Sequence, residues 1–141
     1  MATLPKSDFL QFQSVMLIDQ SSSELYATEQ TLLIGADIRQ IHKERDPIQA
    51  LEMLKNAKAP QDLPQIIFLD IKNSTPNSFV FLEEFTRLPQ WIRDNTRVVL
   101  MSIYFQFKTE LDYRIAKYSF VTDQVTKPLD IRQLYRLQPA C

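Results

Sequence analysis

Three short apolar segments each run directly into polar side chains, and this pattern constrains the fold more than any other feature of the chain. The segments are residues 15–18, followed by Asp19 and Gln20; residues 65–69, followed by Asp70; and residues 98–101, followed by Ser102. Short apolar runs bounded by polar residues are typical of buried strands. Strands that end in carboxylates and hydroxyls are typical of open α/β sheets, which bind ligands at the carboxyl edge.

The rest of the chain alternates between strand and helix patterns. Strands are predicted at residues 14–19, 38–43, 65–70, 97–102 and 119–125. Helices are predicted at residues 22–34, from Pro47, at residues 79–88, around Leu111 and at residues 130–137. Ser22 and Ser23 are candidate caps of the first helix, and Gly35 is expected to end it in a left-handed conformation.

Five strands alternating with five helices predict an α/β fold with a doubly wound, five-stranded parallel sheet. We expect the flavodoxin-like strand order 2-1-3-4-5, which puts the first and third strands side by side at the switch point. Asp19, Gln20 and Asp70 would then surround one crevice, with Ser102 and Lys127 coming from the next two strands. Residues 1–13 are interpreted as a lead-in, residues 14–137 as the domain, and residues 138–141 as a short tail.

Composition excludes several classes of protein. The net charge of −1 indicates no general attraction to nucleic acid or to anionic membranes. Cys141, the one cysteine, cannot form an internal disulfide, which fits a reducing compartment and favours a cytoplasmic location. No segment has the pattern of a membrane span or a signal peptide. With one histidine, His42, and no glycine-rich loop, the sequence offers little support for zinc, hydrolase or nucleotide sites.

Four segments, in order and at matching spacing, resemble the receiver domain of two-component response regulators. They are residues 17–20 (Leu-Ile-Asp-Gln), 67–72 (Ile-Phe-Leu-Asp-Ile-Lys), 99–102 (Val-Leu-Met-Ser) and 125–129 (Val-Thr-Lys-Pro-Leu). The resemblance covers residues 14–137 and implies a signalling domain rather than an enzyme. It also implies that a histidine kinase or a phosphotransfer protein phosphorylates an aspartate, with output through a downstream protein that the sequence does not identify. The sequence leaves open whether the chain forms a homodimer.

The resemblance assigns a role to each candidate residue. Asp70 would be the phosphoacceptor, Ser102 would hydrogen-bond the phosphoryl group, and Lys127 would pair with its oxygens. Asp19, Gln20, Asp70 and the backbone carbonyl of Lys72 would hold Mg²⁺, an ion that prefers oxygen ligands. We expect weak Mg²⁺ binding, because Gln20 stands where receivers carry a second acidic residue and contributes no charge.

Other positions also depart from the receiver pattern. Ser74 and Ser78 stand where a proline and a glycine are usual, so Ser78 would be strained if a positive φ were required there. Gln124 replaces the usual aromatic switch residue. These departures keep an alternative open, in which the chain is a degenerate receiver that binds proteins without being phosphorylated. A flavodoxin-like enzyme is a third reading, with little support because no cofactor loop is present.

Overall fold

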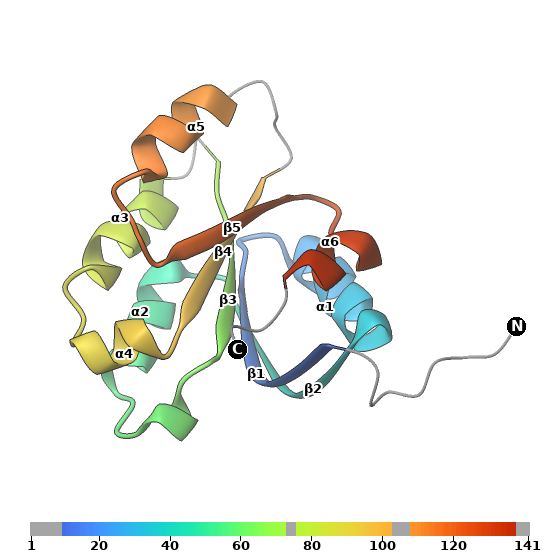
Figure 1. Ribbon diagram of the computed structural model, residues 1–141, viewed down its shortest axis with the longest axis horizontal. Coiled ribbons are helices and arrows are strands. Elements are labelled where there is room, and N and C mark those ends of the chain that lie inside the picture. The colour runs from blue at the N-terminus through green and yellow to red at the C-terminus, as the bar shows by residue number, and fades with distance from the viewer. Residues whose placement is uncertain (1–9, 73–75, 103–107, 138–141) are drawn as a thin grey trace, which may run out of the picture.

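The computed structural model describes residues 10–72, 76–102 and 108–137. Within these ranges the chain forms five strands, six α-helices and one short 3₁₀ helix (Figure 1). The strands are β1 (Leu10–Ile18), β2 (Ala36–Glu44), β3 (Ile66–Asp70), β4 (Arg97–Ser102) and β5 (Val121–Thr126). The helices are α1 (Ser22–Gly35), α2 (Pro47–Lys55), η2 (Pro60–Asp62), α3 (Pro76–Phe85), α4 (Gln90–Asp94), α5 (Lys108–Ile115) and α6 (Ile131–Arg136).

The five strands form one parallel sheet in the order β2-β1-β3-β4-β5, which confirms the predicted flavodoxin-like topology. The register aligns Ile18 with Leu69, Asp70 with Met101, and Ser102 with Thr126. The carboxyl ends of β1, β3, β4 and β5 therefore lie along a single edge. This alignment brings the polar residues that follow the apolar runs to one place.

Two hydrophobic layers cover the sheet, because successive strand residues point to opposite faces. On one face, β3 residues Ile67 and Leu69 pack in a cluster with residues of α2, α3 and α4. On the other face, Ile66 and Phe68 pack with residues of α1 and α6. Figure 1 shows the same division, with α1 and α6 on one side of the sheet and α2 to α5 on the other.

Several predicted boundaries were wrong. β1 begins at Leu10, so the predicted lead-in contributes four residues to the sheet. A sixth α-helix, α4, forms between the predicted helix at residues 79–88 and the predicted strand at residues 97–102, where no helix is predicted. The cap of α1 is Ser21 rather than Ser22 or Ser23, and its hydroxyl accepts a hydrogen bond from the backbone N–H of Glu24 at 3.3 Å. In a run of three serines, the sequence alone therefore does not show which one caps the helix.

Gly35 ends α1 for a different reason from the one predicted. It has no positive φ, so a left-handed conformation is not required. A Cβ atom at this position would instead lie 2.9 Å from Leu134 Cδ2 and 3.2 Å from Ile131 Cγ1. Gly35 is therefore the point at which α6 approaches the end of α1 closely.

Candidate functional site

The carboxyl edge of the sheet gathers three charged side chains that are almost completely buried: Asp19, Asp70 and Lys127. Asp19 directly follows β1, Asp70 is the last residue of β3, and Lys127 directly follows β5. Their exposed fractions are 2%, 5% and 9% respectively. Charged residues are rarely buried to this extent unless they are paired, and all three come from positions that the sequence pattern predicted.

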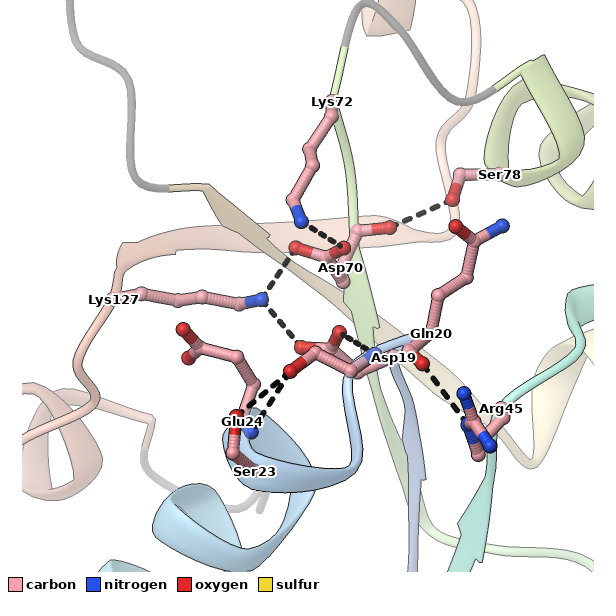
Figure 2. A network of polar contacts seen from close by, with 10 residues as sticks. Asp19, Gln20, Ser23, Glu24, Arg45, Asp70, Lys72, Ser78 and Lys127 are labelled. Atoms are coloured by element: carbon pink, nitrogen blue, oxygen red, sulfur yellow. Dashed lines mark hydrogen bonds and ion pairs between the residues drawn. The ribbon is translucent and has the colours of Figure 1, made fainter.

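Lys127 joins the two carboxylates (Figure 2). Its ammonium lies 2.6 Å from Asp70 Oδ1 and donates a short hydrogen bond to Asp19 Oδ2. The peptide bond between Lys127 and Pro128 is cis. The Lys127 N–H donates to the carbonyl of Ser102 at 3.1 Å, so the end of β4 holds the backbone from which the ammonium extends. The site therefore contains one cation between two anions.

Burial and pairing act in opposite directions on the titration of these groups. Burial raises the pKa of the Asp70 carboxyl, although the hydrogen bond from Lys127 opposes this effect. Burial alone would lower the pKa of the Lys127 ammonium, but its hydrogen bonds to Asp19 and Asp70 outweigh burial and raise it. Lys127 is therefore a permanent positive charge beside Asp70 at neutral pH.

Three further contacts were not predicted. The Lys72 ammonium lies 3.7 Å from Asp70 Oδ2, so the side chain of Lys72 as well as its backbone belongs to the site. The N–H of Ser21 donates to Asp19 Oδ1 at 3.0 Å and orients that carboxylate. The hydroxyl of Ser78 donates to the carbonyl of Asp70 at 2.7 Å and joins the first turn of α3 to the end of β3. A lysine two residues after a strand-end aspartate was the one signal available in the sequence.

The expected strain at Ser78 does not occur. Ser78 lies inside α3 and is buried, and no non-glycine residue in the described part of the chain has a positive φ. A helical serine can place its hydroxyl on a nearby carbonyl, which a glycine cannot do. Ser74, the other departure in this loop, lies outside the described residues.

Ser102 and Gln20 are less closely involved than the three buried charges. Ser102 is half-buried at the end of β4, next to Thr126 of β5 in the sheet register. Gln20 is exposed, and its backbone carbonyl accepts a hydrogen bond from Arg45 Nε at 3.0 Å. In the view of Figure 2, the Gln20 side chain lies on the opposite side of Asp70 from Lys127.

The donor set suits magnesium in its chemistry but provides little charge. Asp19 and Asp70 offer carboxylate oxygens, and Mg²⁺ is commonly held by one or two carboxylates together with several waters. Within the described ranges, no group of three or more His, Cys, Asp or Glu side chains could hold a metal ion. The two carboxylates face two ammonium groups, those of Lys127 and Lys72, so these four side chains sum to zero charge.

Comparison with known proteins identifies the fold. An open parallel sheet with the strand order 2-1-3-4-5 defines the flavodoxin-like class. Within this class, the chain is similar to a response regulator receiver protein from Dyadobacter fermentans (22% identity, TM-score 0.75, covering 89% of this chain and 94% of that one). It is also similar to a two-component response regulator from Cytophaga hutchinsonii (22%, 0.74, 90% and 94%) and to one from Legionella pneumophila (22%, 0.71, 89% and 94%).

The chain therefore has the fold of a response-regulator receiver domain over about nine-tenths of its length. No protein-family model matches the sequence, and no curated protein matches it either. Among the helices of the described residues, none combines the length and the apolar character that crossing a bilayer requires.

Proposed function

We propose that this chain is a signal receiver that accepts a phosphoryl group on Asp70 from a histidine kinase or a phosphotransfer protein, in the cytoplasm. One observation carries the proposal. The Asp70 carboxylate is buried at the strand end with Oδ1 2.6 Å from the Lys127 ammonium, which also pairs with Asp19. A nucleophilic carboxylate with a fixed cation beside it is the arrangement that phosphoryl transfer needs, since the protein mainly positions groups and neutralises charge.

The proposed step balances as a simple transfer. A carboxylate oxygen of Asp70 attacks the phosphorus of a phosphohistidine, an O–P bond forms and the P–N bond breaks. The departing imidazole nitrogen keeps the electron pair and takes up a proton. Lys127 shifts from its ion pairs toward the new phosphoryl oxygens, as a flexible point charge can, and the Ser102 hydroxyl donates to one of them. Lys72, already 3.7 Å from Asp70 Oδ2, adds a second positive charge.

Magnesium forms part of the proposal as a weakly bound ion. Asp19, Asp70, Gln20 and the backbone carbonyl of Lys72 would hold it, and when bound it would neutralise phosphoryl charge. Other residues of the chain hold the two carboxylates in place. Asp19 is oriented by the N–H of Ser21, and Asp70 is fixed through its own carbonyl by Ser78.

Intact-mass spectrometry tests the proposal directly. The chain is incubated with Mg²⁺ and a small phosphodonor, beside an Asp70→Asn variant, which has nearly the same shape but lacks the nucleophilic carboxylate. We expect wild type to gain the mass of one phosphoryl group and the variant to gain none. A gain that persists in Asp70→Asn would remove Asp70 from the role. No gain in wild type with any donor would favour the second candidate function.

That second candidate is a receiver fold that binds its partner without phosphorylation. Two observations favour it: Gln20 is exposed and uncharged, and Gln124 donates a hydrogen bond to Asp112 Oδ1 at 2.8 Å. This bond joins β5 to α5, across the region that a mobile aromatic residue would use as a switch. Beryllofluoride, a phosphoryl mimic, separates the two candidates, because a binding module of this kind would not bind it.

A further inference from the structure

The two oxygens of the Asp70 carboxylate each lie beside a different ammonium group (Figure 2). The Lys127 ammonium is 2.6 Å from Oδ1, and the Lys72 ammonium is 3.7 Å from Oδ2. The two lysines come from different segments, because Lys127 follows β5 whereas Lys72 comes two residues after Asp70, the last residue of β3. The chain itself therefore places a cation on either side of the carboxylate.

The two lysines differ in how firmly they are held. The Lys127 side chain is 2% exposed and also pairs with Asp19, whereas the Lys72 side chain is 28% exposed. At 3.7 Å, the contact of Lys72 with Asp70 is an ion pair and is too long for a hydrogen bond. An ammonium on a flexible, partly exposed stem can follow a group that reaches Asp70 from solvent.

Phosphorylation would make the site more negative, and Lys72 would offset part of this change. A carboxylate carries one negative charge, whereas a phosphoryl group on the same oxygen carries close to two at neutral pH. Asp19, phosphorylated Asp70 and Lys127 would together sum to about −2. The Lys72 ammonium reduces this sum to about −1, so it opposes the charge that transfer creates.

The acidic side chains that would attract a divalent cation are few. Asp19 and Asp70 both pair with Lys127, and the neighbouring Gln20 is exposed and uncharged. In the part of the chain that the structure describes, no cluster of three acidic, histidine or cysteine side chains is placed to hold a metal ion. Lys72 would also compete with an added cation for Asp70 Oδ2.

We infer that the Lys72 side chain supplies the positive charge needed for phosphoryl transfer to Asp70, so that transfer proceeds without a bound divalent cation. This inference rests on the proposed function and specifies its cation. With acetyl phosphate as donor, a carboxylate oxygen of Asp70 attacks phosphorus, and an O–P bond forms. The bond from phosphorus to the acetate oxygen breaks, and acetate leaves with the electron pair. Lys127 and Lys72 then pair with the phosphoryl oxygens.

The rate of phosphorylation with and without metal tests the inference. The chain is mixed with acetyl phosphate in MgCl₂ or in EDTA, and intact mass is followed over time. The wild-type rate in EDTA should lie within about threefold of the rate in MgCl₂. Lys72→Met in EDTA should react at least about tenfold more slowly than wild type in EDTA, because one unit charge beside the acceptor is lost.

Three comparisons separate the charge of Lys72 from a structural effect. Lys72→Arg keeps the charge and should recover most of the rate that Lys72→Met loses in EDTA. Added MgCl₂ should also recover most of the loss in Lys72→Met. Lys55→Met removes a lysine that pairs with Glu52 at 3.5 Å at the end of α2, and it should react as wild type does.

Magnesium binding provides a readout that does not depend on phosphorylation. MgCl₂ is titrated into ¹⁵N-labelled wild type, Lys72→Met and Lys55→Met at constant ionic strength, with the Ser21 amide as reporter, because it donates to Asp19. Lys72→Met should bind Mg²⁺ roughly tenfold more tightly than wild type, since a competing positive charge is gone. Lys55→Met should bind it as wild type does.

Three results would overturn the inference. A wild-type mass gain in MgCl₂ but not in EDTA would show that transfer needs the metal, and the proposed function would stand. Equal rates for wild type and Lys72→Met in EDTA would show that the ammonium takes no part. Equal Mg²⁺ affinities of these two proteins would show that Lys72 does not compete with a cation. The absence of any gain in wild type in both solutions would instead reject phosphorylation of Asp70, and the inference with it.

Discussion

Restoring a carboxylate at position 20 should strengthen magnesium binding about tenfold. Gln20 follows β1 beside Asp19, at the carboxyl edge of the sheet, and it is exposed. A unit negative charge about 4 Å from a divalent cation contributes roughly 2 kcal/mol at the dielectric of water and roughly 8 kcal/mol at an effective dielectric of 20. Because the side chain is exposed, the value near 2 kcal/mol applies, and desolvation reduces it to about 1.4 kcal/mol, which is a factor of ten.

The comparison needs a control that changes size without changing charge. Gln20→Asp and Gln20→Asn are nearly isosteric, so the difference between their Mg²⁺ dissociation constants isolates the carboxylate. The Ser21 amide is a suitable reporter, because it donates to Asp19 Oδ1 at 3.0 Å and its chemical shift should respond when Asp19 becomes a metal ligand. Titration of MgCl₂ at constant ionic strength, followed by ¹⁵N spectra, gives the Mg²⁺ affinities of wild type, Gln20→Asp and Gln20→Asn.

A ratio below about twofold between Gln20→Asp and Gln20→Asn would refute the reasoning. It would show that position 20 lies too far from the ion for its charge to be felt. A second informative result is a tenfold gain in Mg²⁺ affinity for Gln20→Asp that appears only when Lys72 is also changed to methionine. The net charge of the site, with Lys72 3.7 Å from Asp70, would then be limiting rather than the number of carboxylates.

Three other substitutions test the remaining structural arguments. Lys127→Met should lower the free energy of unfolding by about 3 kcal/mol in urea denaturation at neutral pH. The reason is that it leaves the buried carboxylates of Asp19 and Asp70 without their main partner. A loss under about 1 kcal/mol would contradict this. Gly35→Ala should cost about 1 kcal/mol in the same assay despite its better helix propensity, because the new Cβ would meet Leu134 Cδ2 at 2.9 Å, and a variant as stable as wild type would show that α6 yields easily. Gln124→Phe should enlarge the changes in amide hydrogen exchange that beryllofluoride causes across α5 and α6, since the bond to Asp112 is removed; large changes in wild type would show a working switch without its aromatic residue.

The sheet could be predicted from sequence because its strands carry their own signal. The residues of β3 are all buried, so an uninterrupted apolar run marks the strand and the polar residue that ends it. The boundaries at β1 and α4 could not be predicted in the same way. The start of β1 is fixed by pairing with β2, from Leu10 with Ala36 onward, and such pairing partners are distant in sequence. The role of Gly35 could not be predicted for a similar reason, since Ile131 and Leu134, the residues of α6 that approach it, are distant in sequence.

The residues of the site could be predicted from the sequence, but the balance of positive and negative charge among them could not. Asp19, Asp70 and Lys127 stand at strand ends, where topology alone brings them together. The contact of the Lys72 side chain with Asp70 could not be predicted, because a side chain's direction in a loop follows from packing rather than from spacing. Its ammonium nevertheless changes the electrostatics of the site.

The contact of Lys72 with Asp70 links the two functions considered for this chain. A site with three carboxylates and one lysine would carry a net negative charge, and that charge would repel an incoming phosphoryl group unless a cation offset it. The side chains here, two carboxylates and two ammonium groups, are already neutral as a set. The neutrality from which we expect weak magnesium binding would also reduce repulsion between the site and an incoming phosphoryl group. Weak magnesium affinity and phosphorylation of Asp70 are therefore compatible, and loss of one does not imply loss of the other.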